Sequence, residues 1–419
     1  MFSKNLDINL TEKELSQSKT KTAVLLNKLL SEPLWLLFGL VSFILCKSLK
    51  GSHMQVAILT MIQPSVGLLI LYWSSSIHSN SEKLKSNLVW SGLLARVPFL
   101  FFPWVESPWT FILCASIYIF FYRASNPPWM EILKINLPSK DRGRVYSFAS
   151  ALGYAEGFLI SLWVVPWLRH DEMAWRICFP IAALVGMASV IVQSWVIPSG
   201  YRVITKKEKS VFSLKTTLLQ PWKEAYSVMS SRPDFTRFQI GFFVCGFGLV
   251  MSTAIIPIYC ANVLNITLSE FATARLICMC VGYVLFSKFW SVKLNSLPIF
   301  EFMVYVMSCF ILFAIFLILA SFDTRFLYLA FFIYGIGQAG SHLSWNLSGP
   351  IFSKEKSSTV FSSINVLMVG IRGCIAPALG SLTYIYFSPY IVFTFFILLS
   401  FVAIWVMIKG LSSNYVHVN

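Results

Sequence analysis

Long apolar runs separated by short polar loops follow one another along almost the whole chain. Most runs have about 20 residues, the length at which an α-helix crosses the hydrocarbon core of a bilayer. Polar and apolar residues do not alternate within them, as they do in the strands of a membrane β-barrel, so the pattern predicts helices. About twelve spans are predicted, near residues 31–48, 54–74, 87–104, 108–136, 144–168, 174–197, 236–259, 270–290, 298–321, 325–349, 358–383 and 387–409.

The ends of the chain and one central connection interrupt this pattern. The first twenty residues are polar, and we expect them to be disordered. Residues 23–32 read as a short interfacial helix, because the apolar part of the first span begins only at Pro33. A surface helix is predicted within the central connection, near residues 218–229. The predicted organisation is a cytoplasmic tail with the interfacial helix at 1–30, a six-helix bundle at 31–198, a cytoplasmic linker at 199–235, a second six-helix bundle at 236–410 and a cytoplasmic tail at 411–419.

Charged residues are too scarce for a soluble protein. Only 12% of the residues are charged and 57% are apolar, with a mean hydropathy of +0.70, whereas about a quarter of a typical soluble chain is charged. The composition therefore indicates an all-α integral membrane protein that has the lipid bilayer as a partner.

The basic residues that give the net charge of +15 are unevenly distributed between the two sides of the predicted membrane. With the N-terminus in the cytoplasm, Lys and Arg in the inner loops outnumber those in the outer loops by roughly five to one, as the positive-inside rule requires. This distribution argues against nucleic acid as the partner and places both termini in the cytoplasm. We expect a multi-pass, monomeric protein of a bacterial inner membrane. The basic residues left outside are Lys47, Lys50, Arg169, Arg176 and Arg325.

The nine cysteines lie almost wholly inside the apolar runs. Cys278 and Cys280 stand close together, but no histidine or further cysteine follows at zinc-ligand spacing. They are therefore interpreted as small buried side chains, and no metal or other cofactor is expected. The sequence also has no Gly-Lys loop that could cradle a nucleotide phosphate, so any energy for transport would come from a gradient.

Two stretches about 215 residues apart read alike. In each, a tryptophan (Trp129 or Trp345) ends an apolar helix, a short basic loop follows, and the next apolar helix carries one ionisable residue well inside it, Glu156 or Arg372. Repeated halves in an apolar chain are typical of transporters.

Twelve spans in two groups of six, parallel halves and internal termini resemble the major facilitator superfamily. The best local matches are the loop Leu137–Arg144 (LPSKDRGR), its partner at 350–357, and the span-eleven segment Gly370–Gly380. The superfamily's Gly/Asp/Arg signature between spans two and three is missing, because residues 74–85 read SSSIHSNSEKLK. The resemblance implies two pseudo-symmetric six-helix bundles around a central solute site.

Ionisable residues at membrane depth cost about 3 kcal/mol each on insertion scales, so each needs a partner or a function. Spans four, five, ten and eleven line the cavity in the superfamily that the chain resembles. The candidate solute-binding residues on these spans are Arg123, Trp129, Glu156, Gln338, His342, Trp345 and Arg372. Glu156 is the candidate for proton coupling, since partial desolvation favours protonation of a carboxylate.

Plainer interpretations remain for most of these residues. Arg123 and Glu156 could form a structural bridge between spans, and His342 could be a satisfied interior histidine. The two tryptophans could be interfacial anchors. Arg96, within span three, reads as structural because that span lies away from the cavity in the superfamily.

A second group of charged residues stands at the cytoplasmic ends of the central spans. These residues are candidates for a cytoplasmic gate. They are Glu131, Arg142, Arg144 and Lys354.

These patterns predict a secondary active transporter that moves a small organic solute by alternating access. Arginines in the cavity favour an anionic solute, and Glu156 favours proton coupling. Two other classes of function stay open. One is a membrane-embedded enzyme acting on lipid-linked substrates, although the ionisable residues lie at mid-depth rather than at one face. The other is a non-transporting sensor or assembly protein, which the missing signature favours.

Overall fold

A computed structural model of the chain describes residues 2–77, 82–196, 214–353 and 358–412. Within these residues the fold is helical and contains no strand. The first half consists of α1 (Phe2–Phe38), α2 (Val41–Lys47), α3 (His53–Ile77), α4 (Glu82–Arg96), the 3₁₀ helix η1 (Val97–Trp104), α5 (Pro108–Asn136), α6 (Ser139–His170) and α7 (Trp175–Ser194). The predicted all-α class is confirmed.

The second half begins with a surface helix, α8 (Leu214–Ser231), which covers the helix predicted near 218–229. The remaining elements are α9 (Pro233–Ile258), the π-helix η2 (Tyr259–Val263), α10 (Leu268–Ala272), the π-helix η3 (Thr273–Cys278), α11 (Met279–Ser296), α12 (Ile299–Leu319), α13 (Arg325–Ser353), α14 (Ser358–Tyr386) and α15 (Pro389–Ser412).

Broken helices explain why the elements outnumber the predicted spans. When α1–α2, α4–η1, α9–η2 and α10–η3–α11 are each joined, the described helices other than α8 form twelve successive segments at the predicted positions. Eight stretches in the described residues are long and apolar enough to cross a membrane. The spans predicted at 54–74, 87–104, 108–136 and 325–349 are not among these eight.

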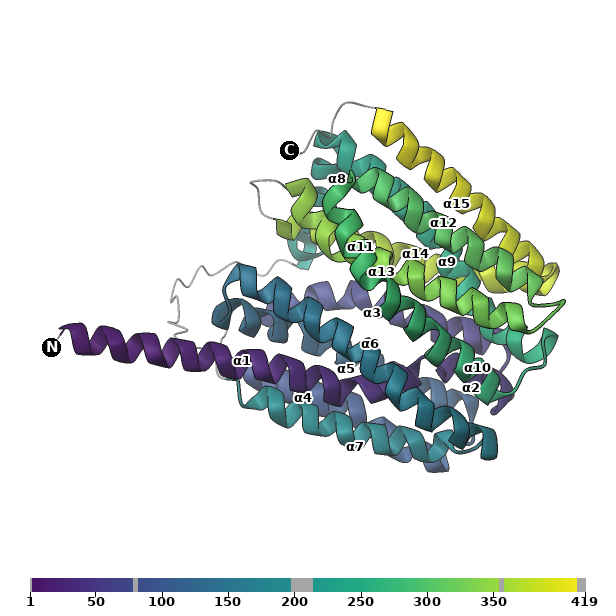
Figure 1. Cartoon of the computed structure of the whole chain (residues 1–419), viewed down its shortest axis with the longest axis horizontal. Helices are drawn as coiled ribbons and strands as arrows, with labels where there is room; N and C mark the ends of the chain where they lie inside the picture. Colours follow the sequence, from purple (N-terminus) through teal and green to yellow (C-terminus); the bar gives the residue numbers. More distant parts are fainter. Residues whose placement is uncertain (1, 78–81, 197–213, 354–357, 413–419) are drawn as a thin grey trace.

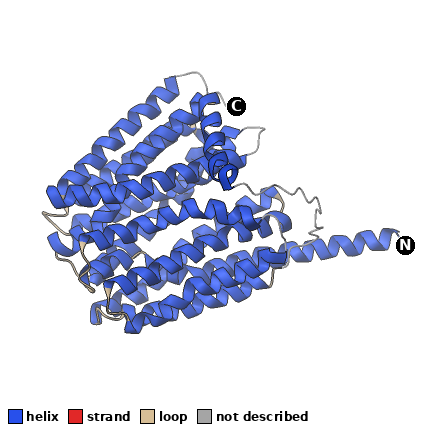
Figure 2. Ribbon diagram, turned by 180° about the vertical axis from the view of Figure 1, so that it is seen from behind, coloured by secondary structure: helices blue, strands red, loops and turns tan. Residues whose placement is uncertain are grey.

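The two halves form two bundles that lie side by side (Figure 1). The first residues of α1 and the last residues of α15 lie at one end of the molecule, named the terminal end, and Figure 2 shows the same arrangement from behind. Along the seam between the halves, α3 packs on α14, and α6 packs on α10, η3 and α11. Each half therefore contributes two long segments to the seam.

At the end opposite the termini, named the far end, the two halves are in direct contact. Lys47 Nζ at the end of α2 donates a hydrogen bond to the carbonyl oxygen of Ile266, in the loop before α10. The rings of Phe43 and Phe271 stack with centroids 4.3 Å apart. The seam is therefore closed at the far end.

The structure differs from the sequence prediction at the first helix. Residues 2–38 form one helix, so the segment 23–32 is not a separate interfacial helix and the segment before it is not irregular. Ala23 and Val24 belong to a buried cluster that also contains Trp129 of α5, and Asn136 Nδ2 donates a hydrogen bond to the buried Thr20 hydroxyl. Packing of α1 chiefly on α7 and α6, and to a smaller extent on α5, therefore carries the first span well before Pro33 and takes Lys28 into the bundle.

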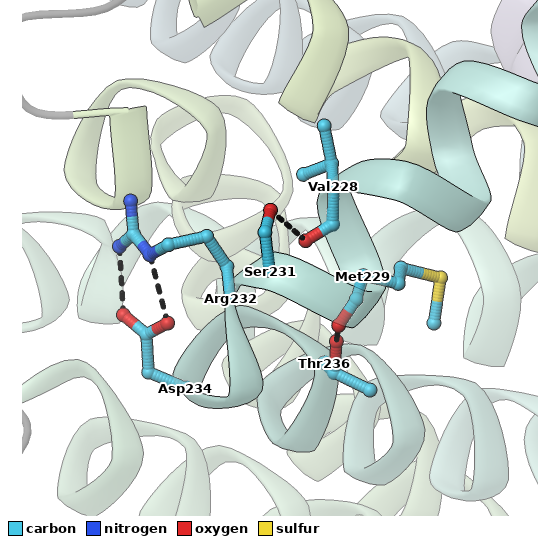
Figure 3. Close-up of polar contacts among 6 residues, drawn as sticks. All are labelled: Val228, Met229, Ser231, Arg232, Asp234 and Thr236. Atoms are coloured by element: carbon cyan, nitrogen blue, oxygen red, sulfur yellow. Dashed lines mark hydrogen bonds and ion pairs between the residues drawn. The ribbon is translucent and has the colours of Figure 1, made fainter.

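The junction between the surface helix and the second half is fixed by polar contacts (Figure 3). The Arg232 guanidinium donates two hydrogen bonds to the Asp234 carboxylate, at 3.0 and 2.7 Å. The Thr236 hydroxyl donates to the Met229 carbonyl oxygen at 2.5 Å. These contacts fix the direction in which α9 leaves α8.

Candidate functional site

A charged cluster lies where α1 approaches α6. Lys28 and Glu32, one helical turn apart on α1, form an ion pair of 2.5 Å, and Glu32 is 4% exposed. Glu156 on α6 lies within electrostatic range of both side chains, and its Oε2 atom is buried without a hydrogen-bond partner among the described residues. The cluster therefore combines the buried Glu32 carboxylate with the half-buried Lys28 ammonium group and the half-buried Glu156 carboxylate.

A glycine lets the Lys28 and Glu32 side chains lie directly against α6. A Cβ atom at Gly153 would lie 2.6 Å from Lys28 Cε and 3.1 Å from Glu32 Oε2. A larger residue there would displace the ends of these two flexible side chains. Gly153 therefore places the ion pair beside Glu156, which follows it by one helical turn.

An aromatic contact joins this cluster to the other half of the protein. Tyr154 of α6 stacks on Tyr283 of α11, with ring centroids 3.6 Å apart and an interplanar angle of 15°. The Tyr283 hydroxyl is 3.2 Å from Nδ1 of His342 on α13. Lys28 acts electrostatically on His342 as well as on Glu156. The structure therefore brings Glu156 and His342 into one polar group across the seam, which we name the seam cluster.

The seam cluster extends to Arg275 of the π-helix η3. Its guanidinium lies over the Tyr334 ring, 5.5 Å from the centroid, and it acts electrostatically on Tyr154. Arg275 also lies close to Gly39, at the break between α1 and α2: a Cβ atom there would meet Arg275 Nε at an ordinary contact distance of 3.7 Å. π-Helical turns occur often at functional sites because they turn side chains out of the regular helical register.

Arg372 does not join the seam cluster by any contact in the described residues. Its side chain packs against α9 of the same half. There Nη1 donates a hydrogen bond to the Phe242 carbonyl oxygen at 2.8 Å, and the guanidinium lies 5.0 Å from the Phe242 ring centroid. Trp345 stacks on the same ring at 6.1 Å. Arg372 and Trp345 are therefore brought together, but against α9.

This position of Arg372 depends on Gly246, because a Cβ atom there would lie only 1.7 Å from Arg372 Nη1. We expect Gly246→Ala to lower the stability by about 1–2 kcal/mol, since the guanidinium must leave its carbonyl and its ring. Thermal unfolding of the purified protein measures this. The matched control is Gly241→Ala in the same helix, where the nearest atom is the flexible Met407 methyl at 2.7 Å. Equal losses in the two variants, or no recovery when Arg372→Met is added to Gly246→Ala, would contradict the assignment.

A polar cavity of about 90 Å³ lies inside the first half, with Lys28 of the seam cluster in its lining. Trp129 lines it and is 6% exposed, so this tryptophan packs inside the bundle and is not an interfacial anchor. Arg96 also lines it and donates hydrogen bonds to the Gly92 carbonyl oxygen and the Ser189 hydroxyl, which agrees with a structural role. Its lining residues are Val24, Asn27, Lys28, Ser31, Arg96, Tyr122, Ser125, Asn126, Trp129, Ala149, Ser150 and Gln193.

The remaining predicted residues are placed as follows. Arg123 does not line the polar cavity, and its Nε atom is buried without a hydrogen-bond partner in the described part of the chain. Gln338 is half-buried on α13, one turn before His342. The side chains of the gate candidates Glu131, Arg142 and Arg144, and the whole of Lys354, lie outside the described residues.

Sequence reasoning missed Lys28, Glu32 and the two stacked tyrosines. One signal was present: Lys28 and Glu32 have opposite charges at a spacing of four, on a helix that leads directly into an apolar run. For the tyrosines no local signal existed, because their contact depends on how α6 and α11 meet.

The sequence model of the Major Facilitator Superfamily matches residues 35–371. No curated protein matches the chain significantly. Among solved structures, the chain is similar to the nucleoside transporter NupG, with 16% identity, a TM-score of 0.59, and coverage of 94% of this chain and 98% of the other. It is also similar to a POT family transporter in complex with 5-aminolevulinic acid, with 11% identity, a TM-score of 0.69, and coverage of 93% and 95%. At these identities the similarity concerns the fold.

Proposed function

We propose, because this chain belongs to the Major Facilitator Superfamily, that it is a secondary active transporter that carries a small organic anion together with a proton. The seam cluster is the observation that carries this proposal. It combines a carboxylate oxygen that has no hydrogen-bond partner among the described residues with an ion pair, and it reaches the opposite half through Tyr154 and Tyr283. A site between two halves is the position expected for solute in such transporters.

The charges of the cluster suggest how proton and anion would bind together. With Glu32 and Glu156 ionised, their two negative charges balance the Lys28 ammonium and the Arg275 guanidinium, so the seam cluster has no net charge with which to attract an anion. Protonation of Glu156 leaves the cluster with a net charge of +1, and Lys28, close to both Glu156 and His342, can then attract the anion. Such electrostatic effects are large in a poorly hydrated interior. Loss of the proton reverses the effect and releases the solute, which is the behaviour of a symporter.

Alternating access then requires the closed far end to open. That movement must separate Lys47 from the Ile266 carbonyl and Phe43 from Phe271. We propose that the protein works in this way as a monomer in a bacterial inner membrane, with its terminal end in the cytoplasm and the far end outside.

Reconstitution tests the function directly. Purified protein in liposomes is given a mixture of labelled small carboxylates, amino acids and nucleosides under an inward proton gradient of one pH unit. With one proton carried per solute, we expect an anion to accumulate up to about tenfold, because one pH unit corresponds to about 1.4 kcal/mol.

The controls are protein-free liposomes and a protonophore, which should abolish accumulation. If no solute enters faster than in protein-free liposomes, the transporter assignment is wrong and the sensor alternative gains. If a solute is converted without net uptake, the enzyme alternative gains.

A further inference from the structure

A second cavity lies at the far end, away from the seam cluster. It has a volume of about 310 Å³ and lies between the last turn of α2 and the π-helix η2, so both halves contribute to it. Its lining contains two lysines, one asparagine and no carboxylate. The lining residues are Cys46, Lys47, Lys50, Gly51, Ala261 and Asn262.

The ammonium group of Lys47 has hydrogen-bonding capacity to spare. It has three N–H donors, and it donates one hydrogen bond to the Ile266 carbonyl oxygen. The acidic residue nearest to Ile266 along the chain is Glu270, and its Oε2 atom is occupied by the backbone N–H and the hydroxyl of Thr267. The Glu270 carboxylate is thus engaged in capping α10. Among the described residues, the ammonium group of Lys47 at the cavity has no counter-ion.

Lys50 is held at the cavity by an uncommon backbone conformation. Its φ angle is 53°, in the left-handed region that favours glycine. The next residue is Gly51, where a Cβ atom would lie 2.8 Å from the Leu45 carbonyl oxygen, so glycine is required there by a close approach. Position 51 is thus glycine because a close contact excludes a Cβ atom, whereas position 50 is lysine although its φ angle would favour glycine. A side chain with a positive charge at position 50 accounts for that choice.

The location of these lysines adds weight to the argument. Lys47 and Lys50 belong to the small set of basic residues that the predicted topology leaves outside, where positive charges are scarce. They stand three residues apart at the closed mouth of the seam, so their fields add in one place.

We propose that this far-end cavity binds a small oxyanion, either a carboxylate or a phosphate group, between Lys47 and Lys50. Oxyanions accept charge-assisted hydrogen bonds from ammonium groups. The Asn262 side chain hydrogen-bonds Tyr384 and, with two N–H donors, keeps at least one to donate into the cavity. If the proposed transport function holds, this is where an anionic solute is held outside the closed seam. Binding at the cavity does not itself require transport, so the two proposals can fail separately. The oxyanion has two sources, a free solute or the headgroup of an anionic lipid.

Protection of lysines from chemical modification tests the site in the intact chain. The protein in phosphatidylcholine nanodiscs is treated with a water-soluble acylating ester, in phosphate or in chloride at equal ionic strength, and each lysine is quantified by mass spectrometry. We expect phosphate to slow acylation of Lys50 about fivefold, because its ammonium group is engaged. Lys223, exposed on α8, is the internal control and should react equally in both salts.

A second lipid composition identifies the source of the anion. If Lys50 in phosphatidylcholine nanodiscs is protected from acylation only when phosphate is added, the site binds a free oxyanion. If Lys50 is protected without phosphate, and only in nanodiscs that contain phosphatidylglycerol, the site binds a lipid headgroup. Equal acylation of Lys50 under all these conditions overturns the proposal.

A surface variant gives an independent test of the same site. Lys50→Gln removes one charge from an exposed turn and should weaken phosphate binding, measured by titration calorimetry, about tenfold, while Lys223→Gln should leave it unchanged. Phosphate binding to Lys50→Gln that equals the unmodified protein would also overturn the proposal, whatever the transport assays show.

Discussion

Replacing Glu156 with glutamine should reduce proton-driven accumulation of solute from about tenfold to none, which is the largest functional effect that we expect. Glutamine keeps the size and the hydrogen-bonding capacity of the side chain, but it cannot gain or lose a proton near neutral pH. The Oε2 atom of Glu156 is buried without a described partner, so the substitution breaks no described hydrogen bond at that atom.

A second measurement separates coupling from simple loss of the protein. Exchange of labelled for unlabelled solute, with equal solute and equal pH on both sides, should continue in Glu156→Gln, because it needs alternating access but no net proton movement. Glu106→Gln, in an exposed loop, is the matched control and should accumulate solute normally. Full accumulation by Glu156→Gln would remove this residue from the mechanism and would place coupling elsewhere, with Glu32 the next carboxylate in the cluster.

The sequence predicted the positions of the helices well because each membrane span is one continuous apolar segment, which the hydropathy of that segment alone identifies. The repeat was also informative. It placed Trp129 and Trp345 on α5 and α13, and Glu156 and Arg372 on α6 and α14, at matching places in the two halves. The family resemblance and the all-α class followed from these local and periodic features, and both are confirmed.

The contacts of the candidate residues were less predictable. The depth of Lys28 and Glu32 depends on the packing of α1 on α7 and α6, more than 100 residues away in the sequence, which buries Ala23 and Val24, and hydropathy cannot register such packing. An interfacial helix was therefore predicted where the first span in fact continues.

The direction in which a long side chain points could not be predicted from the sequence either. Arg372 was predicted at mid-span, but it turns toward α9 because Gly246 leaves space there and Phe242 supplies a carbonyl oxygen and a ring. In the first half, Gly153 leaves room for the ends of the Lys28 and Glu32 side chains, which lie within electrostatic range of Glu156. In both halves a glycine on one helix leaves the space that a charged side chain of another helix occupies.

Close packing of α11 on α13 gives the largest stability effect that we expect. A Cβ atom at Gly282 would lie 2.1 Å from the Phe332 carbonyl oxygen, and one at Gly335 would lie 2.1 Å from the Met279 carbonyl oxygen. Both obstacles are backbone atoms, which cannot rotate away, so an alanine must separate the two helices. Small residues at such crossings are the usual basis of helix association in membranes. We expect Gly282→Ala to cost about 3 kcal/mol and to lower the apparent melting temperature by about 5 °C.

This crossing also positions the seam cluster, since Gly282 directly precedes Tyr283 and α13 carries His342. Separating the helices should lengthen the 3.2 Å contact between the Tyr283 hydroxyl and His342 Nδ1 and disturb the stack of Tyr283 on Tyr154. Solute exchange should therefore fall in Gly282→Ala even at temperatures where the protein remains folded. Tyr283→Phe, which removes the hydroxyl and keeps the ring, should reduce exchange without the same loss of stability.

Gly157→Ala is the matched control for this crossing, because its nearest neighbour is the flexible Leu36 Cδ1 at 3.2 Å. It lies on α6, one residue after Glu156, so it tests whether any added methyl group near the seam has the same effect. A melting temperature for Gly282→Ala equal to that of Gly157→Ala would show that α11 and α13 tolerate separation. The seam cluster would then have to be held in place by α6 and α1 alone.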